Sequence, residues 1–555
     1  GRLSSAPDPW LWDFLLAPVT KSYPFEVHDL APTSEMSTLR IWIQGTTDLP
    51  VEPDHHVRVY LNGMLLEDFT LEGERDLMTE TELLPGALRE GENVLEIENV
   101  GDTGAAFSRI MLNRFELSYP RQLVGEAGQI HGSFGESGVA EITGLTGKAF
   151  IVDTTDSTHR WLSGAESLEG GLRFHAEAGR RYLVADSQAL HHPEVREPLA
   201  SLLKRTTYGA HYLVIGPESL LEASWPLLEL RRSQGLTSLA VPIEEIYSEF
   251  GHGESRPEAV RDFLEHAYHH WGTPPRYVLL LGDGTFDFKD YLGWGVTNQV
   301  PPFPFRSSYL WTASDPAYAS VNGDDSLPDI AIGRLPAANL DEARVMVEKI
   351  VAYETAGHGL DGRAVLIADR PDPAAGDFVA NAEELASTLL SGRDVTKIYL
   401  HRLGVAATHD AILEAFDEGA SLMSYIGHGG MRLWTQNVLR VEHVDSLGFQ
   451  SQQPVLLTMN CLNGYFQFPN FDSLSETLLK AEGKGIIAAF SPSGESLDGP
   501  AHLYHKALMR ELLRGDHHTI GDAILAAQTA YAESGAFPEL LSIYHLFGDP
   551  ALKLR

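Results

Sequence analysis

The segment Pro454-Val-Leu-Leu-Thr-Met-Asn-Cys-Leu-Asn-Gly464 joins a continuous apolar run to a polar, glycine-containing end. Its cysteine, Cys461, is the only cysteine of the 555 residues. A short apolar run bounded by turn residues is typical of a strand that is buried on both faces, as in parallel sheets. Cys461 therefore comes where a strand ends, and ligands of open parallel sheets bind beyond that end.

A second segment of the same form lies upstream. The apolar run Ala420-Ser-Leu-Met-Ser-Tyr-Ile426 leads into Gly427-His428-Gly429-Gly430. Two neighbouring strands that end at one sheet edge bring the imidazole of His428 to the thiol of Cys461. An adjacent imidazole lowers the pKa of a thiol and later protonates the leaving amine, so the pair predicts Cys/His hydrolase chemistry. Taken singly, the segments also fit a tight turn with a solvated histidine and a buried structural cysteine.

Backbone groups beside the pair are suited to hold an oxyanion. The small residues Gly429 and Gly430 let the main chain approach a substrate closely, and we expect their amides and that of Cys461 to act as donors. Ser491, in the segment Ser491-Pro-Ser-Gly494, is expected either to wall the substrate cleft or to belong to a turn between a strand and a helix.

Strands and helices alternate from residue 207 onward. The expected strands are 212–216, 238–242, 277–282, 329–333, 363–368, 395–399 and 485–490, and the expected helices are 220–234, 257–271, 340–353 and 376–391. Apolar strands between helices indicate parallel sheets that are covered on both faces. A glycine-rich break at 356–362 separates two predicted α/β subdomains, 207–357 and 358–555.

The front of the chain has a different pattern. Strands with period-two alternation are expected at 39–44, 56–61 and 91–98. Asn62-Gly63 is a strong hairpin signal. Residues 1–120 are therefore predicted to be an all-β, jelly-roll-like sandwich. Residues 121–206, with expected strands at 149–153 and 181–185, are predicted to form a small β-rich module or linker region.

The composition restricts the classes of partner. There are 41 Lys and Arg residues against 77 Asp and Glu residues, a net charge of −36. Nucleic acid is excluded as a partner because phosphate binding needs a basic surface. The negative charge attracts cationic peptides, or it serves solubility alone. One cysteine excludes an intrachain disulfide, and no apolar run approaches the ~18 residues of a transmembrane helix.

The two site segments resemble the gingipain family of caspase-like-clan cysteine peptidases. The similarity is carried by Ser424-Tyr-Ile-Gly-His-Gly-Gly430 and Leu457-Thr-Met-Asn-Cys-Leu-Asn-Gly464. Further matches are 277–283, 314–318, 323–336 and 544–550, so that the resemblance covers about residues 207–555. It implies a caspase-like catalytic domain of two Rossmann-like subdomains, with the dyad in the second. It also implies that His428 is the general base and acid, and that Cys461 is the nucleophile of a thioester acyl-enzyme.

The resemblance suggests a determinant of specificity. Asp315, in Ser314-Asp-Pro-Ala-Tyr318, matches an aspartate that lines the primary pocket of arginine-specific members. A carboxylate there would pair with an arginine or lysine of the substrate, which predicts cleavage after these residues. Alternatively, Asp315 caps a loop or binds an ion.

Family members often carry structural calcium, although the chemistry itself requires no cofactor. Hard oxygen ligands at loop positions suit Ca²⁺. The candidate ligands are Asp283, Asp287, Asp324 and Asp325, with Asp290 and Asp329 nearby. The same carboxylates fit helix caps and salt bridges equally well.

Three functions therefore remain open. The first is a secreted or cell-surface cysteine endopeptidase that acts on protein or peptide substrates. The second is a sortase-like transpeptidase of the same family, because an acyl-enzyme can pass its acyl group to water or to an amine. The third is a non-catalytic surface adhesion or glycan-binding protein. The chain begins Gly-Arg-Leu, without a methionine, and is expected to be a piece of a longer precursor.

Overall fold

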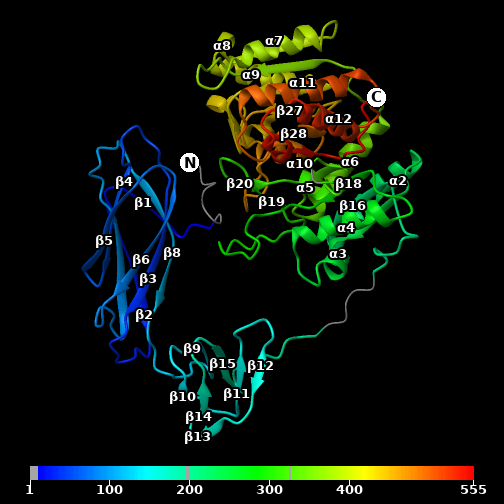
Figure 1. Cartoon of the computed structure of the whole chain (residues 1–555). Coiled ribbons are helices and arrows are strands. Elements are labelled where there is room, and N and C mark those ends of the chain that lie inside the picture. Colours follow the sequence, from blue (N-terminus) through cyan, green and yellow to red (C-terminus); the bar gives the residue numbers. More distant parts are fainter. Residues whose placement is uncertain (1–9, 196–200, 324, 326) are drawn as a thin grey trace. The chain divides into compact units, whose positions relative to one another are not determined.

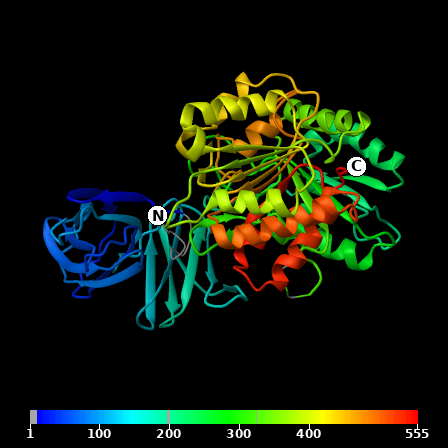
Figure 2. The same cartoon turned by 90° about the horizontal axis from the view of Figure 1, so that it is seen from above.

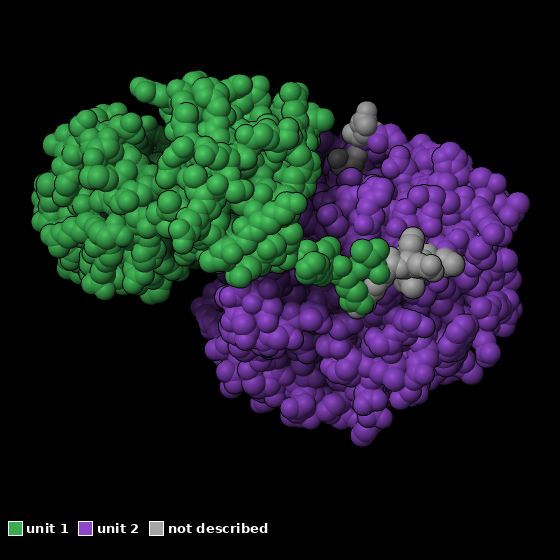
Figure 3. Space-filling view, turned by 90° about the horizontal axis from the view of Figure 1, so that it is seen from below, with its two compact units in different colours: residues 1–196 green, residues 197–555 purple. Residues whose placement is uncertain are grey.

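The computed structural model describes residues 10–195, 201–323, 325 and 327–555. The chain divides into two compact units, residues 1–196 and 197–555 (Figures 1 and 3). The first unit consists of strands, and the second alternates strands and helices. Each unit has hydrophobic cores of its own.

Two four-stranded antiparallel sheets open the first unit. One has the order β1 (Asp13–Leu16), β8 (Arg109–Ser118), β3 (Ser37–Gly45), β6 (Asp76–Leu83); the other has the order β2 (Val19–Val27), β7 (Gly91–Asn99), β4 (His55–Leu61), β5 (Met64–Leu71). Alternate side chains such as Ile41, Val57 and Leu95 form their common core. Asn62 and Gly63 join β4 to β5 with positive φ angles of 52° and 81°, as a two-residue hairpin turn requires. The all-β prediction for this region is confirmed.

A smaller group of strands completes the first unit. β12 (Arg160–Leu162), β11 (Ala149–Asp153), β15 (Arg181–Asp186) and β9 (Gln129–Ser133) form one sheet; β10 (Gly138–Thr143), β14 (Gly171–Ala176) and β13 (Glu166–Leu168) form another. Its core includes Ile142, Ile151 and Phe174.

A ten-stranded sheet organises the second unit. Its order is β17 (Ser238–Pro242), β16 (Tyr212–Gly216), β18 (Tyr277–Leu281), β21 (Ala331–Leu335), β29 (Tyr544–Phe547), β28 (Ala488–Pro492), β27 (Val455–Met459), β24 (Leu422–Ile426), β22 (Ala364–Ala368), β23 (Val395–Tyr399). Neighbours are parallel except β28 and β29, which are antiparallel. The strands of the two predicted subdomains thus share one sheet. The strands of the second run opposite to those of the first, except β29, which is parallel to β21. The carboxyl ends of β24 and β27 share an edge, whereas β18 ends at the opposite one.

Helices cover both faces of this sheet (Figure 2). They are α1 (Glu218–Leu221), α2 (Trp225–Ser233), α3 (Ile243–Phe250), α4 (Pro257–His270), α5 (Pro316–Ala319), α6 (Leu340–Thr355), α7 (Phe378–Thr388), α8 (Leu400–Leu403), α9 (Val405–Asp417), α10 (Leu474–Lys480), α11 (Asp498–Arg514), α12 (Ile520–Glu533) and α13 (Glu539–Ile543). Val278 and Leu280 pack on one side with Phe263 of α4. Leu279 packs on the other with Val347 of α6. Among the described residues, no helix is both long and apolar enough to cross a membrane.

Candidate active site

The register of two neighbouring strands places His428 and Cys461 together. β24 and β27 are parallel, and Ile426 lies opposite Met459 at their ends. His428 and Cys461 each follow that pair by two residues, and the Gly427 amide donates to the Met459 carbonyl at 3.2 Å. The imidazole and the thiol therefore leave the same sheet edge at the same level. In the described part of the chain, no hydrogen bond joins the two side chains directly.

A glycine allows the two loops to approach each other. A Cβ atom on Gly429 would lie 2.2 Å from Nδ2 of Asn460, the residue before Cys461. That separation is far shorter than any real contact, so only glycine fits without moving the loop. Gly429 and Gly430 then form the short strand β25, which pairs with β26 (Leu433–Trp434) to make a hairpin directly after His428.

The His428 ring is held by a carboxylate that the sequence did not reveal. Its Nε2 lies 2.9 Å from Oδ2 of Asp372, and the Phe378 ring packs on it at 5.2 Å. The hydrogen bond from His428 lowers the pKa of Asp372, with help from the Ala374 amide. Tyr425 donates its hydroxyl to the His428 carbonyl at 2.6 Å. With Nε2 engaged by Asp372, Nδ1 is the ring nitrogen left for proton transfer.

Cys461 faces the segment that follows β28. Ser496 donates its amide to Sγ at 3.4 Å, and Sγ lies 3.7 Å from the Ser496 carbonyl. Burial raises the pKa of the thiol, and the Ser496 amide opposes this only in part. The neutral thiol therefore predominates near pH 7, and it needs a base to become a nucleophile.

The raised pKa of Cys461 predicts how alkylation of its thiol depends on pH. Because the pKa of Cys461 is raised, alkylation by iodoacetamide without substrate should accelerate through a midpoint above the ordinary thiol value of about 8.5. Samples quenched at successive times at each pH and analysed by mass spectrometry give the rate of alkylation, with free N-acetylcysteine as the reference. A rate that is already at its plateau below pH 7 would show a preformed thiolate and contradict this account.

The residue after the cysteine has an unusual backbone conformation. Leu462 has a φ of 62°, which is rare for a bulky side chain. Its amide donates to the Gly494 carbonyl at 3.1 Å, which fixes the turn from the other side. Such conformations persist only where the surroundings enforce them, and they concentrate at functional sites.

Asn463 joins the His428 hairpin to the Cys461 loop. It is fully buried, and its Oδ1 accepts from Trp434 Nε1 and Asn460 Nδ2, each at 2.6 Å. Its Nδ2 donates to the carbonyls of Gly430 at 2.6 Å and Leu433 at 3.4 Å. One amide thus ties together the two loops that carry the imidazole and the thiol.

The variant Asn463→Asp keeps the accepting half of this hydrogen-bond network and removes the donating half. The acceptor oxygen survives, but a carboxylate oxygen then faces the carbonyls of Gly430 and Leu433 in place of a donor. We expect kcat on a short peptide to fall about 10²-fold with little change in KM, because displacing a reacting group by about 1 Å costs that much. Exposed Asn437→Asp is the matched control. An unchanged kcat in folded Asn463→Asp would contradict the role.

Ser491 does not line a cleft. The strand predicted at 485–490 is observed as β28 and extends to Pro492, so Ser491 lies inside the sheet. It is fully buried, accepts a hydrogen bond from Thr458 Oγ1 at 2.7 Å, and lies 2.7 Å from Ser475 Oγ. The prediction that Ser491 contacts substrate is therefore wrong. The position that touches the thiol is Ser496.

Asp315 is not available to a substrate either. Its two carboxylate oxygens accept from Nε and Nη2 of Arg334, both at 2.7 Å, and both side chains are buried. Burial raises the pKa of Asp315, but the charge and hydrogen bonds of Arg334 outweigh it and hold this pKa well below its usual range. The predicted substrate contact is wrong because the carboxylate is already paired inside the fold.

The predicted calcium ligands are not brought together. Asp287 accepts from the amides of Tyr291 and Leu292, and Asp325 accepts from the amide of Leu327. These carboxylates cap their own loops, and Asp324 lies outside the described residues. Asp290 and Asp329 also cap loops, at Gly295, Val321 and Asn322.

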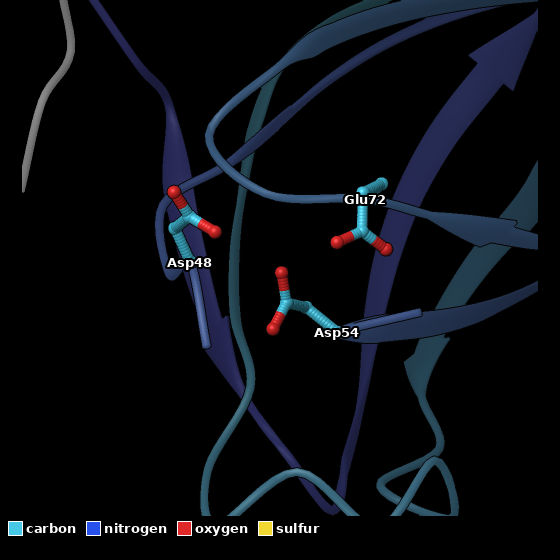
Figure 4. A group of neighbouring side chains, drawn as sticks. All are labelled: Asp48, Asp54 and Glu72. Atoms are coloured by element: carbon cyan, nitrogen blue, oxygen red, sulfur yellow. The ribbon is translucent and has the colours of Figure 1, made fainter. Parts of the chain in front are cut away.

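Among the described residues, two clusters of three carboxylates do converge, each with oxygens within 4.8 Å of one another. The first joins Asp283 to Asp472 and Glu476, where Lys480 Nζ lies 2.7 Å from Asp472. An ammonium already supplies the positive charge, so this set does not fit a divalent ion. The second comprises Asp48, Asp54 and Glu72 in the first unit (Figure 4). Asp54 there accepts from the amides of Leu49 and Gly73.

Comparison with known proteins decides the family. The model of peptidase family C25 matches residues 205–555, well over half of the chain. The chain belongs to this family. Gingipain R2 of Porphyromonas gingivalis (strain ATCC BAA-308 / W83) is 25% identical over 363 residues, covering 62% of this chain and 46% of the relative. This chain thus spans less than half of that relative. The predicted gingipain resemblance is confirmed.

Solved structures agree on the fold. The Arg-specific cysteine proteinase gingipain R has a TM-score of 0.53 at 22% identity, over 65% of this chain and 80% of that one. Dimeric latent PorU from Porphyromonas gingivalis has a TM-score of 0.55 at 16% identity, over 99% of this chain and 53% of that one. At these identities the likeness supports the fold alone. The predicted caspase-like fold is confirmed at that level.

Proposed function

We propose that this C25 member is an endopeptidase that cleaves polypeptides with a Cys461–His428 dyad. The observation that carries the proposal is the shared register of the two residues beyond Ile426 and Met459. No cofactor is needed for this chemistry, because the thiol supplies the nucleophile and the imidazole moves the proton.

The proposal implies the following catalytic steps. His428 takes the thiol proton, and Asp372 holds the ring and stabilises the imidazolium that forms. The thiolate attacks the scissile carbonyl, and we expect the amides of Cys461, Gly429 and Gly430 to donate to the oxyanion. The tetrahedral adduct expels the amine, which takes its proton from His428 and leaves a thioester. Water, deprotonated by His428, releases the acid and restores the thiol.

We propose that the residue before the cleaved bond is Arg or Lys. Gingipain R is named as Arg-specific. In this chain, acidic groups lie near His428: Asp498 interacts electrostatically with both His428 and Asp377. Burial raises the pKa of Asp498, and Asp377 adds to the effect. A substrate guanidinium or ammonium would relieve that repulsion. Cleavage of a positional peptide library tests this, and a preference for an apolar or acidic residue would reject it.

Resolution of the thioester by an amine is the second candidate activity. Both outcomes use the same acyl-enzyme, so the dyad does not favour one over the other. Products formed with and without added glycinamide separate them by mass. A product that is larger by one amine would indicate transpeptidation, and acid alone would indicate hydrolysis. We also propose a secreted or cell-surface location, on the strength of the gingipain relationship.

A further inference from the structure

A cavity of about 630 Å³ lies in the second unit, apart from the dyad. Its size is within the range of ligand sites. Its charged lining consists of five carboxylates and two cations: Asp283, Glu342, Glu442, Asp445, Asp472, Arg432 and Lys480. The two cations are already paired, Lys480 with Asp472 at 2.7 Å and Arg432 with Glu442 at 3.4 Å. Negative charge therefore remains in excess.

A buried carboxyl oxygen without a hydrogen-bond partner lies beside one end of the cavity. Glu476 is fully buried, and its Oε2 accepts from the Ser473 amide at 2.7 Å as part of a capping box. Its Oε1 has no hydrogen-bond partner within the described part of the chain, and the ammonium of Lys480 stays 4.0 Å away. This oxygen lies within 4.8 Å of carboxylate oxygens of Asp283 and Asp472. Three carboxyl groups thus share the ammonium of Lys480 at this end of the cavity.

Aromatic side chains border the other end. Phe471 lines the cavity, and its ring contacts those of Trp294 at 6.3 Å and Phe468 at 5.7 Å. Arg432 lies over the Phe471 ring at 5.5 Å. Trp294 and Phe471 are 43% and 45% exposed, so two neighbouring large rings are presented to solvent beside the cavity. Trp294, Phe468 and Phe471 are called the aromatic rim below.

The cavity is continuous with the loops of the dyad. Arg432 lies in the hairpin that follows His428, and Phe471 lies in the loop that follows Cys461. The Leu474 amide, at the start of α10, donates to the Met431 carbonyl of that hairpin at 2.8 Å. The hairpin after His428 and the loop after Cys461 therefore each contribute a side chain to the lining of the cavity.

We propose that this cavity is an exosite for the polypeptide substrate. It takes a lysine or arginine side chain among its carboxylates, and an adjacent aromatic residue of the substrate packs on the aromatic rim. The inference rests on the proposed peptidase function. The excess negative charge of the lining accounts for the basic group, and the exposed rings account for the aromatic one.

Binding is tested without catalysis in the full chain carrying Cys461→Ala. The peptide acetyl-Lys-Phe-Lys-amide is titrated, with acetyl-Glu-Phe-Glu-amide as the charge control, and isothermal calorimetry gives the affinity. We expect only the basic peptide to bind, and at least tenfold loss of affinity in Asp445→Asn/Phe471→Ala. Equal binding of both peptides, or none, overturns the proposal. Binding of CaCl₂ in the cavity without any peptide would also overturn the proposal, because the cavity would then be a metal site.

Kinetics separate the exosite from the dyad. In the enzyme with Cys461 intact, Asp445→Asn/Phe471→Ala should raise KM for unfolded β-casein at least fivefold and leave kcat/KM unchanged on a short arginyl amide. Exposed Asp410→Asn/Phe449→Ala is the matched control and should change neither. Equal loss on both substrates, or no loss on casein, contradicts the exosite. If the wild type cleaves neither substrate while Lys-Phe-Lys still binds, the peptidase proposal fails instead.

Discussion

Cys461→Ala is expected to lower kcat/KM on peptide substrates by about 10⁴-fold or more, because removing a covalent nucleophile leaves only binding and oxyanion stabilisation. The chain has no other cysteine that could replace it. The thiol is half-buried and alanine removes a single sulfur atom, so the fold should persist. Release of a fluorescent amine from an arginyl peptide gives the rate.

The control for Cys461→Ala is a check that the variant remains folded. Far-ultraviolet circular dichroism and the melting temperature of Cys461→Ala should match those of the wild type within a few degrees. Cys461→Ser should also be nearly inactive, since a serine hydroxyl is far less acidic than a thiol at the same place. Cleavage at wild-type rates in well-folded Cys461→Ala would remove the nucleophile from this account.

Arg334→Met is expected to lower the free energy of unfolding of the second unit by about 3–5 kcal/mol, because it leaves the Asp315 carboxylate buried without its partner. Arg334 is fully buried, and its Nη1 also donates to the carbonyls of Gly282 at 2.9 Å and Val300 at 2.8 Å. In Arg334→Met, the carbonyls of two loops therefore lose their hydrogen-bond donor at the same time as Asp315 loses its positively charged partner. Urea unfolding followed by fluorescence measures the change.

Two further variants test whether the lost stability comes from leaving a buried charge unpaired. Asp315→Leu/Arg334→Met removes both charges and should recover part of the lost stability, since the penalty lies in the unpaired ion. Arg344→Met breaks an exposed pair with Glu222 and should cost no more than about 1 kcal/mol. If Arg334→Met unfolds at the wild-type urea concentration, the buried pair is not what holds these loops.

The elements that the sequence predicts well are those with strong local signals. The predicted strands 149–153, 212–216 and 238–242 have the observed bounds, because an apolar run or alternation stops at a clear turn. The strand predicted at 329–333 is observed at Ala331–Leu335. There the apolar pattern continues through Arg334, whose charge hides that it is buried. Local polarity misleads where a charge is paired inside the protein.

The site was predictable to the extent that it depends on strand order. Cys461 and His428 follow adjacent strands, and the sequence shows both motifs. Asp372 was missed because it follows β22, another neighbour of β24, and no motif marks a carboxylate that only the sheet brings to an imidazole. Asp315 was assigned to a pocket by motif alone, and the structure pairs it with a residue 19 positions away. Partners distant in sequence decide such roles.

The central claim is that the thiol of Cys461 reacts with an acylating substrate under the control of His428. The most direct measurement is intact-mass and tandem mass spectrometry after exposure to an arginyl chloromethyl ketone, in the wild type and in His428→Ala. The account predicts one adduct, located on Cys461, that forms about 10²-fold more slowly in His428→Ala, the usual contribution of a positioned base. An adduct elsewhere, or formation on Cys461 at the same rate in both proteins, would contradict it.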